Sequence, residues 1–370
     1  MEFDRLKPFD NLPLLPPSVN IEDDTEILRK LVGASRALAT INGNLNRLPN
    51  PLMLINTLSL QEAKTSTEIE NIFTTEDELY KAVSDNKKLE VANPATKEVL
   101  KYREALWAGY TTLLENQEID KKLIKQIFNQ IKETTEGYRP PQSRIVIKRG
   151  QSELRPGEVV YTPPRKEEVI DKLMENLIDF LNDDERYQLD PLIKMCVAHY
   201  QFEAIHPFTD GNGRTGRILN LLYLVNKNLL SQPILYISKY IILNKEDYYY
   251  NIGVVTQRNN WKPWINYMLD AVEKTSLITN SLINDIIEQM ELTFEYAKKS
   301  IKWYNKEINE VIFSQPYIKP KMIGQTIGKT SRTTLTKYMN ELVERKILRP
   351  KKIGVEVYYL NDDLIRILEG

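Results

Sequence analysis

The chain has 370 residues, 42% of them apolar, and its 50 Lys and Arg nearly balance its 51 Asp and Glu. This length predicts two or three domains, and the balanced charge excludes a protein that is basic or acidic throughout. A single cysteine, Cys196, excludes an internal disulfide framework. The first residues lack the basic end and apolar run of a signal peptide, and no later apolar run approaches membrane-spanning length. We therefore expect a soluble protein of the cytoplasm.

The first 137 residues predict an N-terminal region of short helices behind a proline-rich lead. Ser59 and Glu62 are three residues apart, which is the spacing of a capping box. In a capping box, the side chain of each residue bonds the backbone amide of the other. This pair predicts a helix that begins after Ser59 and runs from about Leu60 to Asn71.

Residues 138–272 predict a β-hairpin followed by helices. From about Arg144 to Tyr161, branched residues alternate on both sides of a break at glycine and proline, which is typical of a hairpin. A helix is expected after the prolines at 163–164. Its apolar stripe consists of Val169, Leu173, Leu177 and Phe180. A further helix is expected to begin with Asp190 as its cap and Pro191 in its first turn.

Helices are predicted again over Arg217–Asn226 and Lys245–Gln257, and a helical connector over residues 273–315. Residues 316–370 predict a helix, a turn, a second helix and two short strands around Gly354. That order is typical of a winged helix-turn-helix. Because strands are few throughout, the chain is predicted to be mainly α.

The stretch HPFTDGNGRTGR, residues 206–217, is a glycine-rich turn that enters an apolar helix. Its glycines satisfy G-x-G-x-x-G, but a dinucleotide fingerprint needs a strand immediately before the turn, whereas the preceding segment has the pattern of a helix end. The spacing also fits a nucleoside-triphosphate loop. However, Arg217 and Ile218 stand where that loop requires Lys and Ser or Thr. Both common interpretations of this stretch are therefore disfavoured.

The chemistry of the stretch still points to a phosphate ligand. Backbone N–H groups at the start of a helix bind anions, and Arg214 and Arg217, about one turn apart, suit a polyphosphate. Asp210 would repel that polyphosphate unless it carries Mg²⁺, which bridges carboxylate and phosphate oxygens. His206 can accept a proton near neutral pH. Together these groups predict attack by a hydroxyl on a phosphate.

The same stretch resembles the signature of the Fic family, H-x-F-x-D/E-G-N-G-R-x-x-R. Its fixed positions are all matched, by His206, Phe208, Asp210, Gly211, Asn212, Gly213, Arg214 and Arg217. The resemblance covers roughly residues 5–270, and a C-terminal winged helix is an appendage that some members carry. It implies an all-α core and, most often, transfer of AMP from Mg·ATP to a Ser, Thr or Tyr hydroxyl of a protein.

The resemblance also implies roles for single residues. His206 is the expected general base, Phe208 anchors the loop and Asp210 holds Mg²⁺. The phosphates are expected on the backbone amides and side chains of Gly211, Asn212, Gly213, Arg214 and Arg217. The hairpin at about residues 144–161 is expected to bind a target segment as an added strand.

A second family motif, S/T-x-x-x-E-G/N, describes an inhibitory helix. The segment STEIEN matches it with Ser66, Glu70 and Asn71. Ser66 and Glu70 are four residues apart and therefore share one helical face. The resemblance implies that Glu70 forms a salt bridge with Arg217 and removes the partner of the γ-phosphate, so that this chain inhibits itself.

Other notable side chains have plainer interpretations. His199 is expected to be a core or hydrogen-bonding residue, and Cys196 a packed thiol. Tyr248 and Tyr249 are candidates for the border of the adenine site, with core packing an equal alternative for Tyr248.

Three alternatives stay open from sequence alone. The first is another Fic chemistry: transfer of UMP or phosphocholine, phosphorylation, or removal of AMP. The second is a DNA-binding regulator with a nucleotide-sensing core, because residues 319–352 hold ten Lys and Arg against two Asp and Glu. A winged helix also serves as a protein-docking module. The third concerns assembly, since both a homodimer and self-modification are compatible with the sequence.

Overall fold

The structure is a computed structural model, which describes residues 3–45, 47, 51–85, 92–149, 157–328 and 331–369. Of residues 51–56 only the backbone is described. The described chain is mainly α, as predicted, with two small antiparallel sheets. None of the described helices is long and apolar enough to cross a membrane.

Two consecutive helices form the centre of the molecule. They are α7 (Pro191–Ile205) and α8 (Asn212–Asn226), which are buried along almost their whole length. α7 begins with Asp190 as its cap, whose side chain accepts from the amide of Leu192 at 2.8 Å. The pair packs against α4 (Pro94–Asn116), α5 (Lys121–Lys132) and α6 (Glu167–Asn182). α10 (Lys245–Arg258) contacts α7 through the bond between Tyr248 and His199, and α9 (Ile237–Leu243) comes directly before α10. Residues 206–211 join α7 to α8, so the glycine-rich turn sits at one end of the buried pair.

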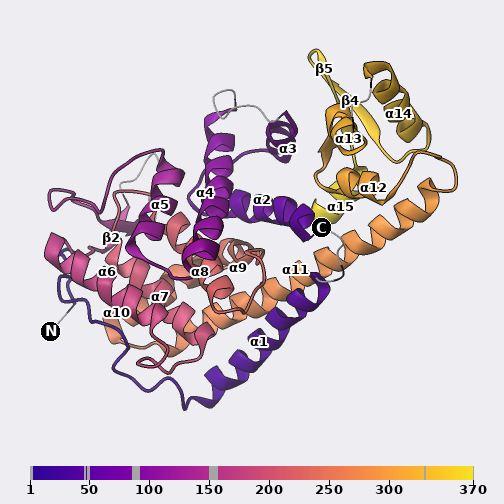
Figure 1. Ribbon diagram of the computed structural model, residues 1–370. Coiled ribbons are helices and arrows are strands. Elements are labelled where there is room, and N and C mark those ends of the chain that lie inside the picture. Colours follow the sequence, from indigo (N-terminus) through magenta and orange to yellow (C-terminus); the bar gives the residue numbers. More distant parts are fainter. Residues whose placement is uncertain are drawn as a thin grey trace.

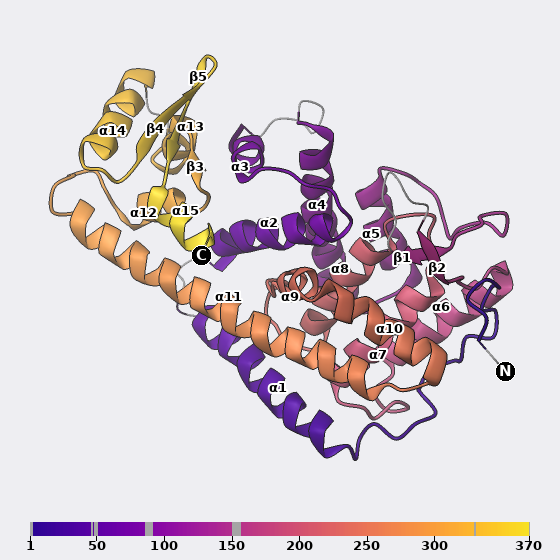
Figure 2. The same cartoon turned by 180° about the vertical axis from the view of Figure 1, so that it is seen from behind.

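A long helix runs along one side of this core. It is α11 (Lys262–Ala297), and α1 (Thr25–Leu45) lies beside it over much of its length (Figures 1 and 2). The expected boundary between residues 272 and 273 falls inside α11, which continues without a break. The predicted connector is not one helix, because α11 ends at Ala297 and α12 (Lys306–Phe313) follows after a turn.

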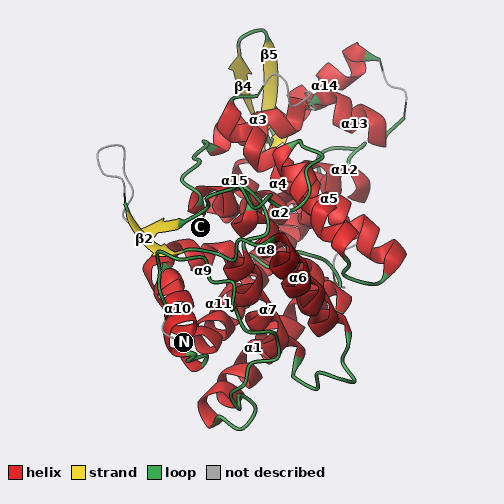
Figure 3. Cartoon of the chain, turned by 90° about the vertical axis from the view of Figure 1, so that its left-hand side faces the viewer, coloured by secondary structure: helices red, strands yellow, loops and turns green. Residues whose placement is uncertain are grey.

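A two-stranded hairpin projects from the helical body (Figure 3). Its strands β1 (Ile147–Arg149) and β2 (Glu158–Tyr161) pair antiparallel, with Lys148 opposite Val159. The tip of the predicted hairpin, residues 150–156, lies outside the described residues. The N-terminal lead passes over β2, where the amide of Phe9 donates to the carbonyl of Thr162 at 3.0 Å.

The C-terminal unit, residues 317–369, follows the predicted order of helix, helix and two strands. Its elements are β3 (Tyr317–Ile318), α13 (Pro320–Thr326), α14 (Arg332–Glu344), β4 (Arg349–Ile353), β5 (Glu356–Leu360) and α15 (Asp362–Glu369). The strands form one sheet in the order β3-β5-β4. Lys329 and Thr330, at the expected start of the second helix, lie outside the described residues.

This unit packs against α3 (Glu76–Asp85), as Figures 1 and 2 both show. Lys319 contacts Asp85 at 2.6 Å, and Lys351 forms an ion pair with Asp77. Arg349 also pairs with Asp362 at 2.6 Å, so at least three of the ten basic residues that suggested DNA binding are engaged within the described part of the chain.

The predicted start of the inhibitory helix is wrong. The helix is α2 (Pro51–Ile69), so Ser59 lies inside it rather than at its cap. Glu62, the other half of the expected capping box, is buried and accepts from the backbone amide of Ser238 at 3.0 Å. Both residues are buried, and for Glu62 the contact with Ser238 replaces the local capping bond that the spacing suggested.

Candidate active site

The turn between α7 and α8 is closed by its own side chains. α7 ends at His206, whose backbone is left-handed with φ 50°, a conformation that commonly terminates helices. Asn212 accepts from the backbone N–H of Phe208 and donates to its carbonyl, both at 2.9 Å. The Asn212 side chain thus makes its hydrogen bonds within the loop. If Asn212 contacts an anion, it does so through its backbone amide. Phe208 is buried and stacks on Phe128, with ring centroids 3.9 Å apart.

Arg139 holds the carbonyls at the end of α7. Its side chain donates to the carbonyl of His206 at 2.7 Å and to that of Ile205 at 3.3 Å, and also to the carbonyl of Pro164. The Arg139 amide donates to the carbonyl of Pro207 at 2.8 Å. One buried guanidinium therefore satisfies acceptors that the helix end leaves open and fixes the backbone of His206.

The imidazole of His206 is neutral at physiological pH. Burial, together with the positive charge of Arg139, lowers the pKa of His206 to about 4. Its Nδ1 is buried and has no hydrogen-bond partner in the described part of the chain. Nε2 is therefore the nitrogen that can meet a ligand and accept its proton.

The N-terminus of α8 faces the same turn. Gly211 precedes it with φ 75°, which glycine adopts without a steric penalty. The first intrahelical bond runs from the amide of Thr215 to the carbonyl of Gly211 at 3.0 Å. The amides of Asn212, Gly213 and Arg214 precede this bond, so they lie at the positive end of the helix dipole, where an anion binds.

Asp210 offers one exposed carboxylate beside that helix end. Its side chain is 66% exposed and contacts Lys132 of α5 at 2.6 Å. Burial works to raise the pKa of Asp210, but the hydrogen bond and charge of Lys132 and the bond from the Gly211 amide together outweigh it and hold the pKa below its usual range. The described residues contain no cluster of three or more acidic, His or Cys side chains around a metal-sized space. A single carboxylate fits Mg²⁺ that arrives with a nucleotide, because Mg²⁺ completes its shell with phosphate and water.

Arg217, one turn into α8, is held by the end of α2. The guanidinium is buried, with Nη2 2.8 Å from Glu70 Oε1 and Nε 2.8 Å from Ser66 Oγ. Burial alone would lower the pKa of Arg217, but the negative charge of Glu70 raises it above its usual value. A Cβ at Gly213 would come within 2.6 Å of Glu70 Oε1. Glycine at this position therefore leaves the space in which the pair forms.

Buried polar contacts anchor the rest of α2. Glu62 accepts from the Ser238 hydroxyl at 2.5 Å and from the Tyr102 hydroxyl at 3.2 Å. Burial raises the pKa of the Glu62 carboxyl, and these hydrogen bonds oppose that effect. Lys245 donates to the carbonyl of Ile69, the last residue of the helix. Glu70 itself lies one residue beyond the end of α2, in the following turn.

Arg214, on the other side of the turn, is held by α4. Its guanidinium is 2% exposed, and Nη1 is 2.5 Å from Glu98 Oε2. Lys101 contacts the other oxygen of Glu98 at 3.3 Å and Glu133 at 3.0 Å. The two arginines of the turn thus have carboxylate partners on two different helices of the N-terminal region.

The two tyrosines expected near an adenine occupy different environments. Tyr248 is buried, and its hydroxyl is 2.8 Å from His199 Nε2, which is a core arrangement. Tyr249 is 42% exposed, and its ring packs edge-on against that of Tyr248. Burial and the charge of Glu70 raise the pKa of Tyr249 to about 12. Only Tyr249 therefore presents ring surface close to the Glu70–Arg217 pair.

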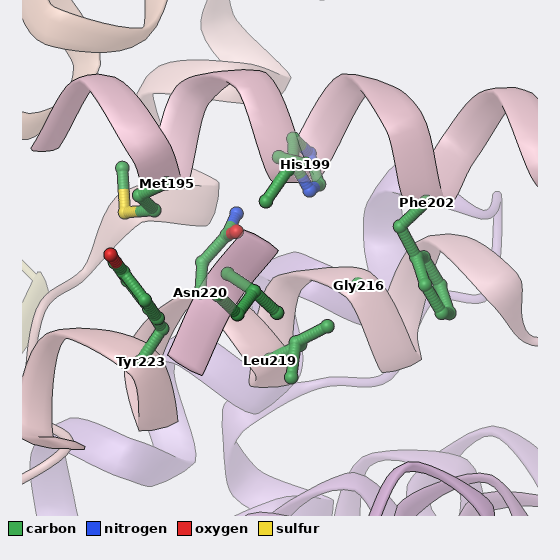
Figure 4. A pocket seen from close by; sticks show the side chains of 9 residues that line it. Met195, His199, Phe202, Gly216, Leu219, Asn220 and Tyr223 are labelled. Atoms are coloured by element: carbon green, nitrogen blue, oxygen red, sulfur yellow. The ribbon is translucent and has the colours of Figure 1, made fainter. Parts of the chain in front are cut away.

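The interior between α7 and α8 has no room for a nucleotide. His199 and Phe202 from α7 face Gly216 and Asn220 from α8 around a closed cavity of ≈ 10 Å³ (Figure 4). Cys196, on α7, is also buried, and burial raises the pKa of its thiol. Any nucleotide has to bind at the outer end of the pair, where His206, Asp210 and the start of α8 meet.

Sequence reasoning missed several residues that hold this turn. Lys132, Arg139 and Glu98 contact partners that are 78, 67 and 116 residues away. No local spacing or motif marks such pairs. Glu98 and Lys132 lie on helices and Arg139 lies in the segment after α5, and their charge alone does not identify a partner.

Three family models match the chain. The model described as Fic/DOC family N-terminal matches residues 28–111, and the one described as Fic/DOC family matches residues 110–224. The model described as protein adenylyltransferase SoFic-like, C-terminal domain, matches residues 289–364. The first two together span both arginine pairs and the turn between α7 and α8.

Curated relatives carry related names. The chain is 30% identical over 152 residues to protein adenylyltransferase fic-1 of Caenorhabditis briggsae, which is 38% of this chain and 28% of that protein. It is 27% identical over 281 residues to probable protein adenylyltransferase aq_aa38 of Aquifex aeolicus, covering 71% of this chain and 82% of that protein. The match thus spans under a third of the nematode relative.

The fold is also found among solved structures. A Fic family protein from Desulfovibrio desulfuricans G20 superposes with a TM-score of 0.56 over 94% of this chain and 98% of that one. The two sequences are 21% identical, so the likeness is one of fold.

Proposed function

This chain belongs to the Fic family, and from that premise we propose that it transfers AMP from Mg·ATP to a Ser, Thr or Tyr hydroxyl of a protein. The observation that carries the proposal is the turn at residues 206–217. It combines a neutral, fixed imidazole, an exposed carboxylate, a free helix N-terminus and two buried arginines. The names of the relatives support the same activity.

In the proposed reaction, Nε2 of His206 accepts the proton of the target hydroxyl. The hydroxyl oxygen forms a bond to the α-phosphorus, and the bond between that phosphorus and the oxygen bridging to the β-phosphate breaks. Pyrophosphate leaves with the electron pair. Arg139 keeps the imidazole in place, because it fixes the backbone of His206. The amides of residues 212–214 stabilise the charge on the phosphates.

Asp210 is the residue that would hold Mg²⁺, which neutralises phosphate charge when bound. Lys132 occupies the Asp210 carboxylate in this structure, and phosphate oxygens would give the ammonium group an alternative partner. Arg214 and Arg217 would bind the outer phosphates. Tyr249 is the better placed of the two tyrosines to border the base, because Tyr248 is bonded to His199 in the core.

Glu70 restrains this reaction in our proposal. The Glu70–Arg217 ion pair occupies the guanidinium that would bind the γ-phosphate. ATP that lacks this partner would settle with its α-phosphorus out of line with the incoming hydroxyl. Misplacement by about 1 Å lowers rates by on the order of 100-fold. Ser66 holds Arg217 toward Glu70 and belongs to the same restraint.

The remaining regions take supporting roles in the proposal. Residues 138–272 form the catalytic part, with β1 and β2 binding a target segment as an added strand. Residues 1–137 contain Glu70 and therefore the restraint. Residues 273–315 connect the catalytic part to the C-terminal unit. Protein targets include other copies of the chain itself.

Labelled nucleotides test the proposal directly. Purified wild-type protein and the Glu70→Ala variant are incubated with Mg²⁺ and either α-labelled or γ-labelled ATP, and label on protein is counted. We expect label from the α position only, and more of it in the variant. Label from the γ position only would indicate phosphorylation instead. Label from α-labelled UTP in place of ATP would indicate transfer of UMP, and release of AMP from modified protein would indicate the reverse reaction.

A further inference from the structure

We propose that Glu98, on α4, is a positioning residue for Arg214, which it holds so that the guanidinium meets the phosphates of the nucleotide. This inference rests on the proposed function, because it assigns a support to a residue of that same site. The family signature includes Arg214 and does not extend to Glu98.

The burial of Arg214 makes such a support necessary. The guanidinium is 2% exposed, and a buried charge is stable only when it is paired and hydrogen-bonded. Glu98 supplies the carboxylate at 2.5 Å and engages Nη1 alone among the donor atoms. A guanidinium has five N–H donors in a rigid plane. The pair therefore fixes that plane and leaves other donors for a second anion.

Arg214 keeps a donor that a ligand could use. Its Nε is buried and has no hydrogen-bond partner in the described part of the chain. Arg214 also lies in the first turn of α8, before the bond from Thr215 to Gly211, together with the backbone amides that suit an anion.

Glu98 is itself held in place. Lys101, three residues further on the same helix, contacts its second oxygen at 3.3 Å and is bound by Glu133 on its other side. Burial works to raise the pKa of Glu98, but the bonds from Arg214 and Lys101 keep it below the usual range. Asn93 caps the helix by accepting from the amide of Thr96 at 2.7 Å. The carboxylate is therefore ionised and bonded on both oxygens.

Direct measurement of ATP binding tests this role without relying on catalysis. The parent is the full chain with Glu70→Ala and His206→Ala, which removes both the restraint and the turnover. We expect Glu98→Gln to raise the Kd of Mg·ATP about tenfold by calorimetry, since the carboxamide oxygen that replaces the carboxylate is an uncharged and weaker acceptor for Arg214. Glu98→Ala should raise it further, and Glu98→Asp should recover part of the affinity because it keeps the charge.

Kinetics and a matched control separate positioning from stability. In the Glu70→Ala chain with His206 present, Glu98→Gln should raise KM for ATP about tenfold and lower kcat much less. The control is Glu104→Gln on the same helix, whose carboxylate accepts from Gln130 at 3.4 Å. We expect this control to keep the parent values of Kd and KM.

Each other outcome overturns the assignment. Tighter ATP binding by Glu98→Gln would mean that Glu98 blocks Arg214 instead of presenting it. A lower Tm with an unchanged Kd would mean that the pair only stabilises the fold. If the parent binds no ATP at all, the proposed function fails and this assignment fails with it. Binding in the parent that ignores Glu98 overturns the assignment alone.

Discussion

α2 and α4 each bring one glutamate to one arginine of the same turn, yet the two pairs differ in how the glutamate is held. Glu98 lies inside α4, is 22% exposed and is bonded on both oxygens. Glu70 lies just beyond the end of α2, is 36% exposed and uses Oε1 for Arg217. In our proposal, the firmly anchored Glu98 supports its arginine, whereas the less firmly held Glu70 restrains its own.

α2 and α4 also differ in the elements that they contact. α4 packs on α5, α8 and α2 in the core. α2 is followed by α3, which carries the contacts of the C-terminal unit at Asp77 and Asp85. Gln61 on α2 donates to the hydroxyl of Tyr80 on α3 at 2.7 Å. A change in the C-terminal unit can thus be transmitted toward Glu70 through α3 and α2. α4 is also next to α3, where the Thr74 and Thr96 hydroxyls are 2.6 Å apart.

The largest expected effect comes from removing the imidazole that accepts the proton. His206→Ala should lower AMP transfer by on the order of 10²–10⁴-fold, which is the usual contribution of a general base. Mg·ATP affinity should change little, because the imidazole acts on the incoming hydroxyl. Rates are measured with α-labelled ATP in the Glu70→Ala background. Transfer near the parent rate would mean that another group takes the proton.

The next effect separates the restraint from the support. Glu70→Ala should speed transfer by on the order of 100-fold, because Arg217 becomes free to bind the γ-phosphate. Glu68→Ala is the matched control, since Glu68 lies on α2 and pairs with Lys64 at 3.2 Å. Self-labelling over time is the measurement. Equal labelling by both variants and the wild type would leave the Glu70 pair with a structural role only.

A smaller effect on the rate of transfer is expected from breaking the contacts between α3 and the C-terminal unit. Asp85 is 1% exposed and bonds Lys319 at 2.6 Å and the Tyr358 hydroxyl at 2.5 Å. Asp85→Asn should lower the free energy of unfolding by on the order of 3 kcal/mol, because Lys319 loses its buried partner. Through α3 and α2 it should also raise transfer by about threefold.

The control for this contact is Asp362→Asn, whose pair with Arg349 is exposed. Such pairs contribute about 0–1 kcal/mol, so little change in stability or rate is expected. A thermal melt and a labelling assay on each variant give both numbers. Faster transfer by Asp362→Asn to the same extent would show that the effect is not specific to α3.

Much of this arrangement could be predicted from the sequence. The helical class, the cap at Asp190 and the order of the C-terminal elements follow from local signals, namely apolar period, proline position and glycine breaks. The turn at 206–217 was recognisable because its residues are contiguous. The Glu70–Arg217 contact was expected from a motif match.

The failures share a physical cause. Ser59 and Glu62 have the spacing of a capping box, but both are buried inside α2, and Glu62 bonds Ser238 instead of the start of the helix. Tyr248 and Tyr249 are adjacent, yet one is buried and one exposed, which depends on the packing of α10 against α11. The supports Lys132, Arg139 and Glu98 depend on tertiary contacts that no local pattern encodes.

The smallest expected effect concerns pH, and it again distinguishes the two glutamates. Burial lowers the pKa of His206 from 6.5 to about 4, and the charge of Glu70 is among the influences that oppose this shift. The neutral imidazole is the active form, so activity requires a pH above that pKa. Transfer by the Glu70→Ala protein should therefore be nearly constant from pH 5.5 to 7.5, whereas an imidazole with a pKa of 6.5 would lose about tenfold at the acid end. Since Glu98 is not among the groups with the largest influence on His206, adding Glu98→Gln should leave the profile unchanged. Initial rates at saturating Mg·ATP, with a return to pH 7.5 to confirm recovery, are the measurement. A midpoint near 6.5 in either protein would mean that the imidazole is solvated during catalysis and that Arg139 does not hold it in the buried position.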